Sequence, residues 1–208
     1  MTASGYTLFD TAIGRVGIVW GSDGIVGVQL PEARVLATRA RIRRRFPDAR
    51  EGVPPVDVRR ALDGIVSLLD GGDADLREIA LDLTGVSAFE RGVYEIARTI
   101  PAGQTTSYGA IAAELGDPGA ARAVGRALGQ NPFPVIVPCH PVIAADGTLG
   151  GFSAEGGTAT KRTMLDIEGA LLDEPTLFDA PATTSPVSPR GASPRASTRV
   201  SPVRAGRR

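Results

Sequence analysis

The sequence predicts a small α/β domain, then a mainly α-helical domain, then a disordered tail. Three observations lead to this prediction. Alternating β-forming residues dominate the first thirty positions, capped helical segments dominate the second half, and the end of the chain is rich in Pro, Ser and Arg. The 208 residues, 42 % hydrophobic, suit one or two ordinary domains. We place the parts at residues 1–84, 85–171 and 172–208.

The elements of the first part follow from its pattern. Residues 6–30 alternate β-forming residues between glycine-rich breaks, which predicts paired strands. Residues 32–46 and 56–71 predict two helices, and residues 80–85 a short strand. The arginines of the first helix could form a nucleic-acid patch, but we interpret them as a solvated helix face. Nothing in this part carries obvious chemistry.

The second part begins with three predicted helices. Residues 87–100 open on a capping box that begins at Ser87. Thr106 can cap a helix that runs to Leu115, and a further helix follows the "GDPG" turn at residues 120–128. Two short helices joined by a glycine-containing turn are typical of a helix-turn-helix, although many helical hairpins look the same.

The last helix of this pair, "AARAVGRALG", is unusual for a protein that reads DNA. It has no Asn, Gln, Ser or Lys to read base edges in the major groove. Gly125 within it lowers helix stability by about 1 kcal/mol relative to alanine. A flat face of small residues with one long arginine suits the minor groove. Helix–helix packing through small residues explains the pattern equally well.

The segment "VIVPCHPVIA" contains the only cysteine and the only histidine of the chain, Cys139 and His140. Pro138 and Pro141 deny this pair a helical backbone. One cysteine excludes an internal disulfide, and the pair alone cannot form a tetrahedral zinc site. A lone cysteine is ordinarily a small buried hydrophobic residue. Because an adjacent imidazole raises the thiolate fraction, we interpret Cys139 as a nucleophile.

Two later segments can assist this pair. The glycine-rich "ADGTLGGFSAEGG" offers backbone N–H groups that could hold a polar acceptor. The helical "TKRTMLDIEGA" carries Glu168, whose carboxylate could orient the imidazole of His140. Alternatively, Glu168 is simply an acid on a helix surface.

These segments, with "TSYG", "AARAVG", "NP", "PCH", "GGFS" and "EG" in order over residues 86–170, resemble the O6-alkylguanine-DNA alkyltransferases, the methylated-DNA–protein-cysteine methyltransferases. The order and spacing make the resemblance specific. The first part is similar, more weakly, to that family's ribonuclease-H-like domain. The resemblance implies a monomer that binds double-stranded DNA in the minor groove. It implies stoichiometric, irreversible alkyl transfer from O6-alkylguanine, and also O4-alkylthymine, to Cys139, with no cofactor or metal.

The resemblance also implies residue roles. Cys139 accepts the alkyl group, His140 takes the thiol proton through a water, and Glu168 holds the imidazole. Tyr108 pushes the 3′ phosphate and bonds the base, and Arg122 fills the space that the flipped guanine leaves. The resemblance also implies that Ala121 and Gly125 contact DNA and that Asn131 joins the helix-turn-helix to the loop. The Val142 carbonyl and the Phe152 ring would contact the base, and the Ser153 N–H would donate to O6.

The chain departs from the family pattern at three places. Pro141 replaces an arginine, which removes a side-chain charge and a backbone N–H. Phe152 replaces the commoner tyrosine and so lacks its hydroxyl. Two extra residues in "SAEGGTATK" alter the spacing between Ser153 and Glu168. The alkyltransferase-like proteins carry Trp where Cys139 stands, so the cysteine favours an active acceptor.

Two other functions stay open at this point. One is a module that binds alkylated bases without transfer and recruits repair factors. The other is a transcription regulator that uses Cys139 as a methyl sensor, although the first part has no metal-binding cysteines. The chain has no apolar run of the ~20 residues that a membrane span needs and no signal-peptide pattern, so we expect a cytoplasmic protein without membrane association. From Pro181 onward the tail carries six arginines and no acid, and it is either a solubilising extension or a polyanion tether.

Overall fold

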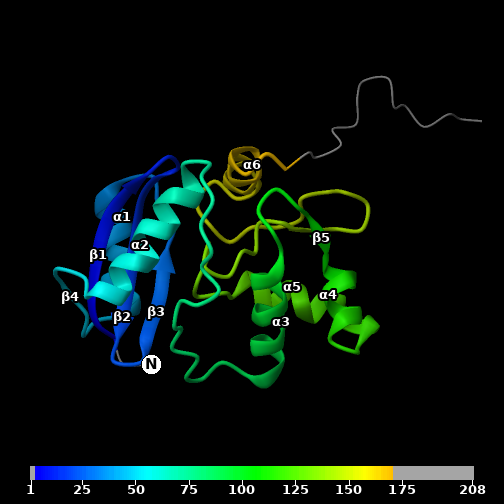
Figure 1. Ribbon diagram of the computed structural model, residues 1–208, viewed down its shortest axis with the longest axis horizontal. Helices are drawn as coiled ribbons and strands as arrows, with labels where there is room; N and C mark the ends of the chain where they lie inside the picture. The colour runs from blue at the N-terminus through cyan, green and yellow to red at the C-terminus, as the bar shows by residue number, and fades with distance from the viewer. Residues whose placement is uncertain (1–2, 171–208) are drawn as a thin grey trace, which may run out of the picture. The chain divides into compact units, whose positions relative to one another are not determined.

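The first part of the chain contains a mixed sheet, and its three antiparallel strands lie where the alternating residues predict paired strands. The computed structural model describes residues 3–170. The strands are β1 (Ala3–Thr11), β2 (Gly14–Gly21), β3 (Gly24–Gln29) and the short β4 (Arg50–Glu51). Their order is β3-β2-β1-β4, and only β4 runs parallel to its neighbour (Figure 1). The hairpins turn at Gly14 and Gly24, whose φ values of 114° and 126° suit glycine.

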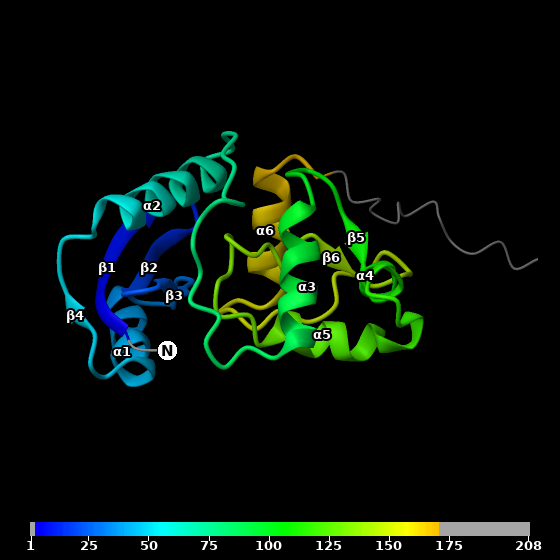
Figure 2. The same cartoon turned by 60° about the horizontal axis from the view of Figure 1, so that its bottom comes forward.

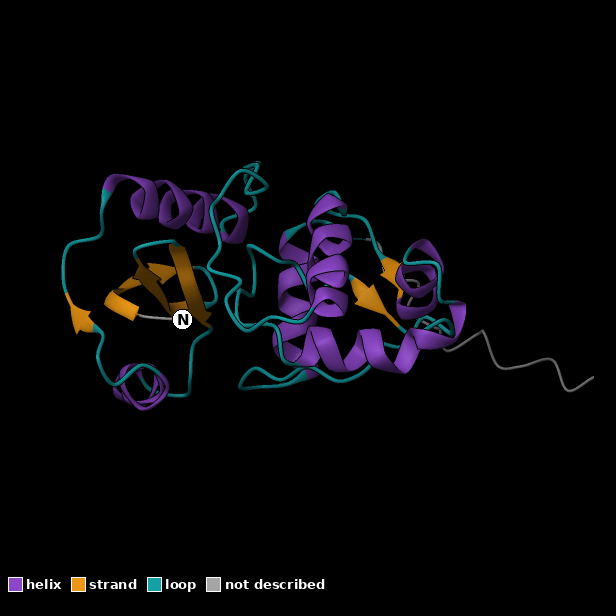
Figure 3. Cartoon of the chain, turned by 90° about the horizontal axis from the view of Figure 1, so that it is seen from below, coloured by secondary structure: helices purple, strands orange, loops and turns teal. Residues whose placement is uncertain are grey.

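Two helices cover opposite faces of this sheet. They are α1 (Val35–Arg45) and α2 (Val56–Leu69), and the strands lie between them in Figures 2 and 3. Because side chains alternate along a strand, β2 directs Ile18 and Val19 into different buried clusters. Ile18 clusters with Ile65 of α2, and Val19 with Ile42 of α1. Gly17 permits the α1 contact, since a Cβ there would lie 2.3 Å from Cδ1 of Ile42.

The second part is mainly helical. Its elements are α3 (Ala88–Thr99), β5 (Thr106–Ser107), α4 (Tyr108–Glu114), the 3-10 turn η1 (Pro118–Ala120), α5 (Ala121–Gly129), β6 (Val142–Ile143) and α6 (Thr158–Ile167). The predicted capping box begins α3, because Ser87 Oγ accepts from the Glu90 N–H at 3.2 Å and the Glu90 carboxylate accepts from the Ser87 N–H at 2.9 Å. The helices α4 and α5 pack together as the predicted hairpin.

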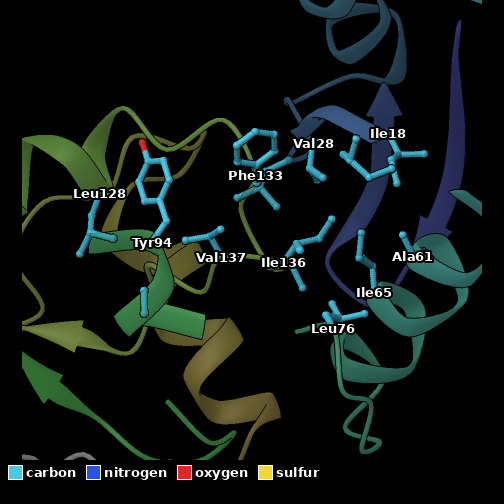
Figure 4. Close-up of a cluster of buried hydrophobic side chains, with 14 of the residues drawn as sticks. Ile18, Val28, Ala61, Ile65, Leu76, Tyr94, Leu128, Phe133, Ile136 and Val137 are labelled. Atoms are coloured by element: carbon cyan, nitrogen blue, oxygen red, sulfur yellow. The ribbon is translucent and has the colours of Figure 1, made fainter. Parts of the chain in front are cut away.

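One hydrophobic cluster joins the sheet to the segment that leads into the Cys–His loop. The segment contributes Phe133, Ile136 and Val137, each no more than 2 % exposed. They share this cluster with Val28 of β3 (Figure 4). The backbones are also joined, because the Val28 N–H donates to the carbonyl of Pro132 at 2.8 Å. The sheet therefore positions the start of the loop.

The predicted strand at residues 80–85 is wrong. Only Leu81 forms an isolated bridge, with Ile25. The chain then turns away, because the Asp82 carboxylate accepts from the Thr84 N–H at 2.9 Å and closes a local turn.

The predicted cap of the helix before the turn is also wrong. Ser107 caps α4, accepting from the Ala110 N–H at 3.1 Å. Thr106 instead pairs with Val142, and β5 and β6 form a parallel ladder that the sequence pattern does not reveal. Strands of two residues are too short to show a period.

The predicted tail, residues 172–208, lies outside the described residues. The predicted boundary near residue 84 stays a prediction. Within residues 3–170, no helix is long and apolar enough to cross a membrane.

Candidate active site

Asn131 fixes the backbone that leads to Cys139. Its Nδ2 donates to the carbonyl of Val137 at 2.8 Å, and its Oδ1 accepts from the Phe133 N–H at 2.9 Å. Between these contacts Val135 has a φ of 75°, which is a strained conformation for a β-branched residue. Strain of this kind persists only where surrounding contacts over-determine the backbone. Asn131 and the buried cluster of the preceding section supply those contacts.

His140 and Glu168 meet as predicted. The distance from Nε2 of His140 to Oε1 of Glu168 is 2.7 Å, and the side chains are 1 % and 11 % exposed. An ionised carboxylate can only accept, so this contact places the proton on Nε2 and leaves the lone pair of a neutral imidazole on Nδ1. Nδ1 is buried and has no hydrogen-bond partner among residues 3–170. Gly156 and Gly157, at φ 79° and 55°, turn the longer segment into α6 without breaking the pair.

Cys139 is a free, partly buried thiol. Burial raises the pKa of this thiol, while the Asn131 side chain and the positive charge of Lys161 lower it. Because burial is the largest of these effects, the thiol is protonated near neutral pH. Burial therefore opposes the rise in thiolate fraction that an adjacent imidazole was expected to give.

Lys161 is a site residue that the sequence analysis missed. It is fully buried, and its Nζ donates to the carbonyls of Val142 and Leu149 at 2.6 and 2.5 Å. It also lies 5.9 Å from the centroid of the Tyr108 ring. Burial lowers the pKa of Lys161, and a negative Cys139 raises it. A signal was present, because Lys161 lies three, four and seven residues before Met164, Leu165 and Glu168, on the buried face of α6.

Cys139 opens onto a pocket of about 160 Å³. The predicted residues that line it are Asn131, Phe152 and Ser153. The other lining residues come from three places: β3 and the residue after it (Val28, Gln29, Leu30), α1 (Arg41, Arg45), and the segments that flank the loop (Leu128, Gly129, Gln130, Pro134, Ala154). The side chains from the first part were not predicted to approach Cys139.

Tyr108 and Val142, predicted to contact a base, do not line this pocket. A Cβ on Gly150 would lie 3.2 Å from the Tyr108 hydroxyl, so the tyrosine packs on the glycine-rich segment. The Val142 carbonyl already accepts from Lys161, but a carbonyl has a second lone pair. A Cβ on Gly125 would meet the Tyr108 ring at 3.8 Å, an ordinary contact, so within the protein this position has room for a Cβ atom.

The outer face of α5 carries the other residues that were predicted to contact DNA. Arg122 is exposed and Ala121 is half-buried. The helix buries Val124, Ala127 and Leu128 on its inner face. The small residues of α5 therefore pack inward and also leave a flat outer surface beside two exposed arginines, Arg122 and Arg126.

Pro141 anchors the loop through its backbone. Its carbonyl accepts from the Thr106 N–H at 3.0 Å, which ties the loop to β5. Pro138 and Pro141 also line a second cavity of about 430 Å³, together with Arg98 and Glu168. Cys139 does not line that larger cavity, so it is not where the thiol reacts. Among residues 3–170, no group of three or more His, Cys, Asp or Glu side chains could hold a metal ion.

Comparisons with known proteins agree on one relationship. Residues 88–170 match the family described as "6-O-methylguanine DNA methyltransferase, DNA binding domain". A methylated-DNA–protein-cysteine methyltransferase of Methanothermobacter thermautotrophicus is 35 % identical over 158 residues, which cover 76 % of this chain and 81 % of the relative. The crystal structure of Mycobacterium tuberculosis OGT in complex with DNA is similar with a TM-score of 0.64 and 34 % identity, covering 79 % of this chain and 92 % of that one. The O6-methylguanine-DNA methyltransferase of Pyrococcus kodakaraensis gives 0.62 and 26 %, covering 79 % and 99 %.

Proposed function

The chain belongs to the methylated-DNA–protein-cysteine methyltransferase family, and we propose that it repairs O6-alkylguanine in DNA by moving the alkyl group irreversibly to Cys139. The observation that carries this proposal is the buried His140–Glu168 pair, 2.7 Å apart, next to a thiol that lines a pocket. Transfer to a thiol needs a proton acceptor and a space for the reacting group, and this arrangement offers both. A non-transferring binding module is not favoured, because the matched relatives are named as methyltransferases.

The reaction conserves atoms and charge. Sγ of Cys139 attacks the alkyl carbon, the S–C bond forms, and the bond from that carbon to O6 breaks. The thiol proton passes through a water to Nδ1 of His140, and the imidazolium is stabilised by Glu168. The imidazolium then releases its proton to solvent while the guanine, freed of the alkyl group, takes up one proton from solvent and stays in the DNA as the neutral base. The thioether does not hydrolyse, so each protein molecule reacts once.

Lys161 and Asn131 stabilise the negative sulfur as it forms. Both lower the pKa of Cys139 against the opposing effect of burial. Interactions that grow as the proton leaves lower the barrier, whereas equal stabilisation of the resting thiol would not. The backbone N–H of Ser153 would act in the same sense at O6, since it favours the departing guanine.

On this proposal, DNA binds across α4 and α5. Arg122 is exposed on α5, and Tyr108 begins α4 beside Gly125. The flat surface of small residues suits the minor groove, where a single arginine can replace a flipped base. We further assign the first part of the chain to the ribonuclease-H-like class and expect the protein to act as a monomer. O4-alkylthymine is a second expected substrate.

Mass spectrometry tests the central step. After incubation with duplex DNA that contains O6-methylguanine, the peptide with Cys139 should gain one methyl group, and the DNA should lose one in equal amount. Cys139→Ala should keep the lesion in the DNA. An unmodified Cys139 in the presence of excess lesion would contradict the proposal.

A further inference from the structure

The pocket at Cys139 contains an unexplained contribution from the first part of the chain. Arg41 and Arg45 of α1 line it together with the nucleophile. The sequence alone presents these arginines as part of a solvated helix face. Their presence at the mouth of the reactive pocket gives that helix a possible role in the choice of substrate.

One of the two arginines is already neutralised. Arg41 Nη1 lies 2.8 Å from Glu32 Oε1, and the Glu32 carboxylate also accepts from Gln29 Nε2 at 3.2 Å. Glu32 is only 14 % exposed, so this pair is held in place at the pocket wall. Its charges cancel, and the pocket gains no net charge from it.

Arg45 is not neutralised. It has no acidic partner among residues 3–170, and its Cζ lies 5.0 Å from the centroid of the Phe46 ring, which orients the guanidinium. Partial loss of hydration and the charge of Arg41 both lower the pKa of Arg45. The remaining ionisable groups near the pocket, Tyr94 and Cys139, are neutral at pH 7, because burial raises the pKa of each. The pocket wall therefore carries one net positive charge.

The pocket is also larger than a methyl group requires. Its volume of about 160 Å³ must hold the base as well, because Phe152 and Ser153, the expected base contacts, line the same pocket. The attacked carbon must lie at Sγ of Cys139. Any atoms beyond that carbon then occupy the pocket that Cys139 shares with Pro134, Ala154 and Arg45.

We propose that this pocket selects O6-alkyl groups that end in an anion, such as a carboxymethyl group, and that Arg45 is the specificity-determining residue. This inference rests on the alkyl-transfer function proposed above. The carboxylate of such a group can reach past the attacked carbon towards the rim of the pocket. There it meets a cation that has no other counter-charge.

Single-turnover rates on paired substrates test this proposal. Duplexes that carry O6-carboxymethylguanine are compared with duplexes that carry the neutral isostere O6-carbamoylmethylguanine, which has nearly the same size. O6-methylguanine is measured in parallel, so that loss of alkyl transfer itself is recognised separately. The proteins are the full chain, Arg45→Gln, Arg45→Lys, and Arg44→Gln as the matched control on an exposed position of the same helix.

The measured quantity is the ratio of the carboxymethyl rate to the carbamoylmethyl rate. Because the guanidinium is at the exposed rim, Arg45→Gln should lower this ratio by about threefold to fivefold. Arg45→Lys should restore most of it, Arg44→Gln should leave it unchanged, and added salt should reduce it in the unaltered chain. An unchanged ratio in Arg45→Gln overturns the proposal, as does an equal loss on all three substrates, which would assign Arg45 to general DNA contact. Absence of transfer from O6-methylguanine would instead contradict the proposed function.

Discussion

Glu168→Gln is expected to slow alkyl transfer while leaving lesion binding intact. The carboxylate lies 2.7 Å from Nε2 of His140, and the two side chains are 11 % and 1 % exposed, so water screens the pair little. The substitution keeps an oxygen acceptor of the same size and removes only the charge. It therefore isolates the electrostatic contribution of Glu168 from its role in orienting the ring.

The magnitude follows from the change in charge on His140. The imidazole becomes positive only when it takes the thiol proton, so the carboxylate stabilises the transition state more than the ground state. A hydrogen bond to a charged group contributes about 1.5–3 kcal/mol, and burial puts this pair in the upper half of that range. Since each 1.36 kcal/mol changes a rate tenfold, loss of about 2–3 kcal/mol predicts a roughly 30- to 150-fold slower transfer.

Rapid-quench measurement of methyl transfer under single-turnover conditions gives the rate. Binding to the same duplex, measured with Cys139→Ala as background, gives the affinity. Glu155→Gln is the matched control, because this acid is exposed in the segment before α6. A Glu168→Gln rate within threefold of the unaltered protein would refute the reasoning, since the carboxylate would then contribute nothing beyond geometry.

Two further outcomes follow from the structure, and a third from the composition of the tail. Lys161→Met removes the positive charge that lowers the pKa of Cys139, so the pH profile of iodoacetamide labelling should move to higher pH; a profile that stays in place or moves lower would contradict this. Asn131→Ala deletes two hydrogen bonds to the backbone and should lower the free energy of unfolding, measured by urea titration, by about 2–3 kcal/mol. Ser87→Ala is the reference: it removes a helix cap, should lower that free energy by about 1 kcal/mol, and should leave alkyl transfer unaffected. Truncation after Ala180 should lower non-specific DNA affinity and its salt slope without changing the chemical step; equal salt slopes would argue for a purely solubilising tail.

The sequence predicts the parts of this protein that have a period or a cap. The β-branched residues around Ile18 and Val19 predict a strand, and their side chains join different buried clusters because successive side chains point to opposite faces of the sheet. Ser87 and Glu90 predict the start of α3 because the two hydrogen bonds of the capping box join residues that are close in the sequence. Cys139, His140 and Glu168 could be proposed because reactive side chains are rare here and chemistry restricts their partners.

What the sequence does not predict depends on contacts between distant segments. Ser107 displaces Thr106 as the cap of α4 because Thr106 is already used by the ladder with Val142. The spacing of Lys161 places it on the buried face of α6, but its contact with the site depends on the carbonyls of Val142 and Leu149, which come from distant segments. Arg45 lines the same pocket as Cys139 only through the packing of α1 beside the sheet, and no local pattern indicates this.

The bond from Val28 to Pro132 shows what the reactive segment needs from its neighbour. The requirement is small: one backbone N–H donor, that of Val28, and an apolar surface against which Phe133 packs. Many different sequences can provide these two contacts, provided that they form a strand at the same position beside the reactive segment. The first part of the chain thus supports the reactive segment mainly through its backbone position and its apolar surface. Its exposed side chains can therefore take other roles.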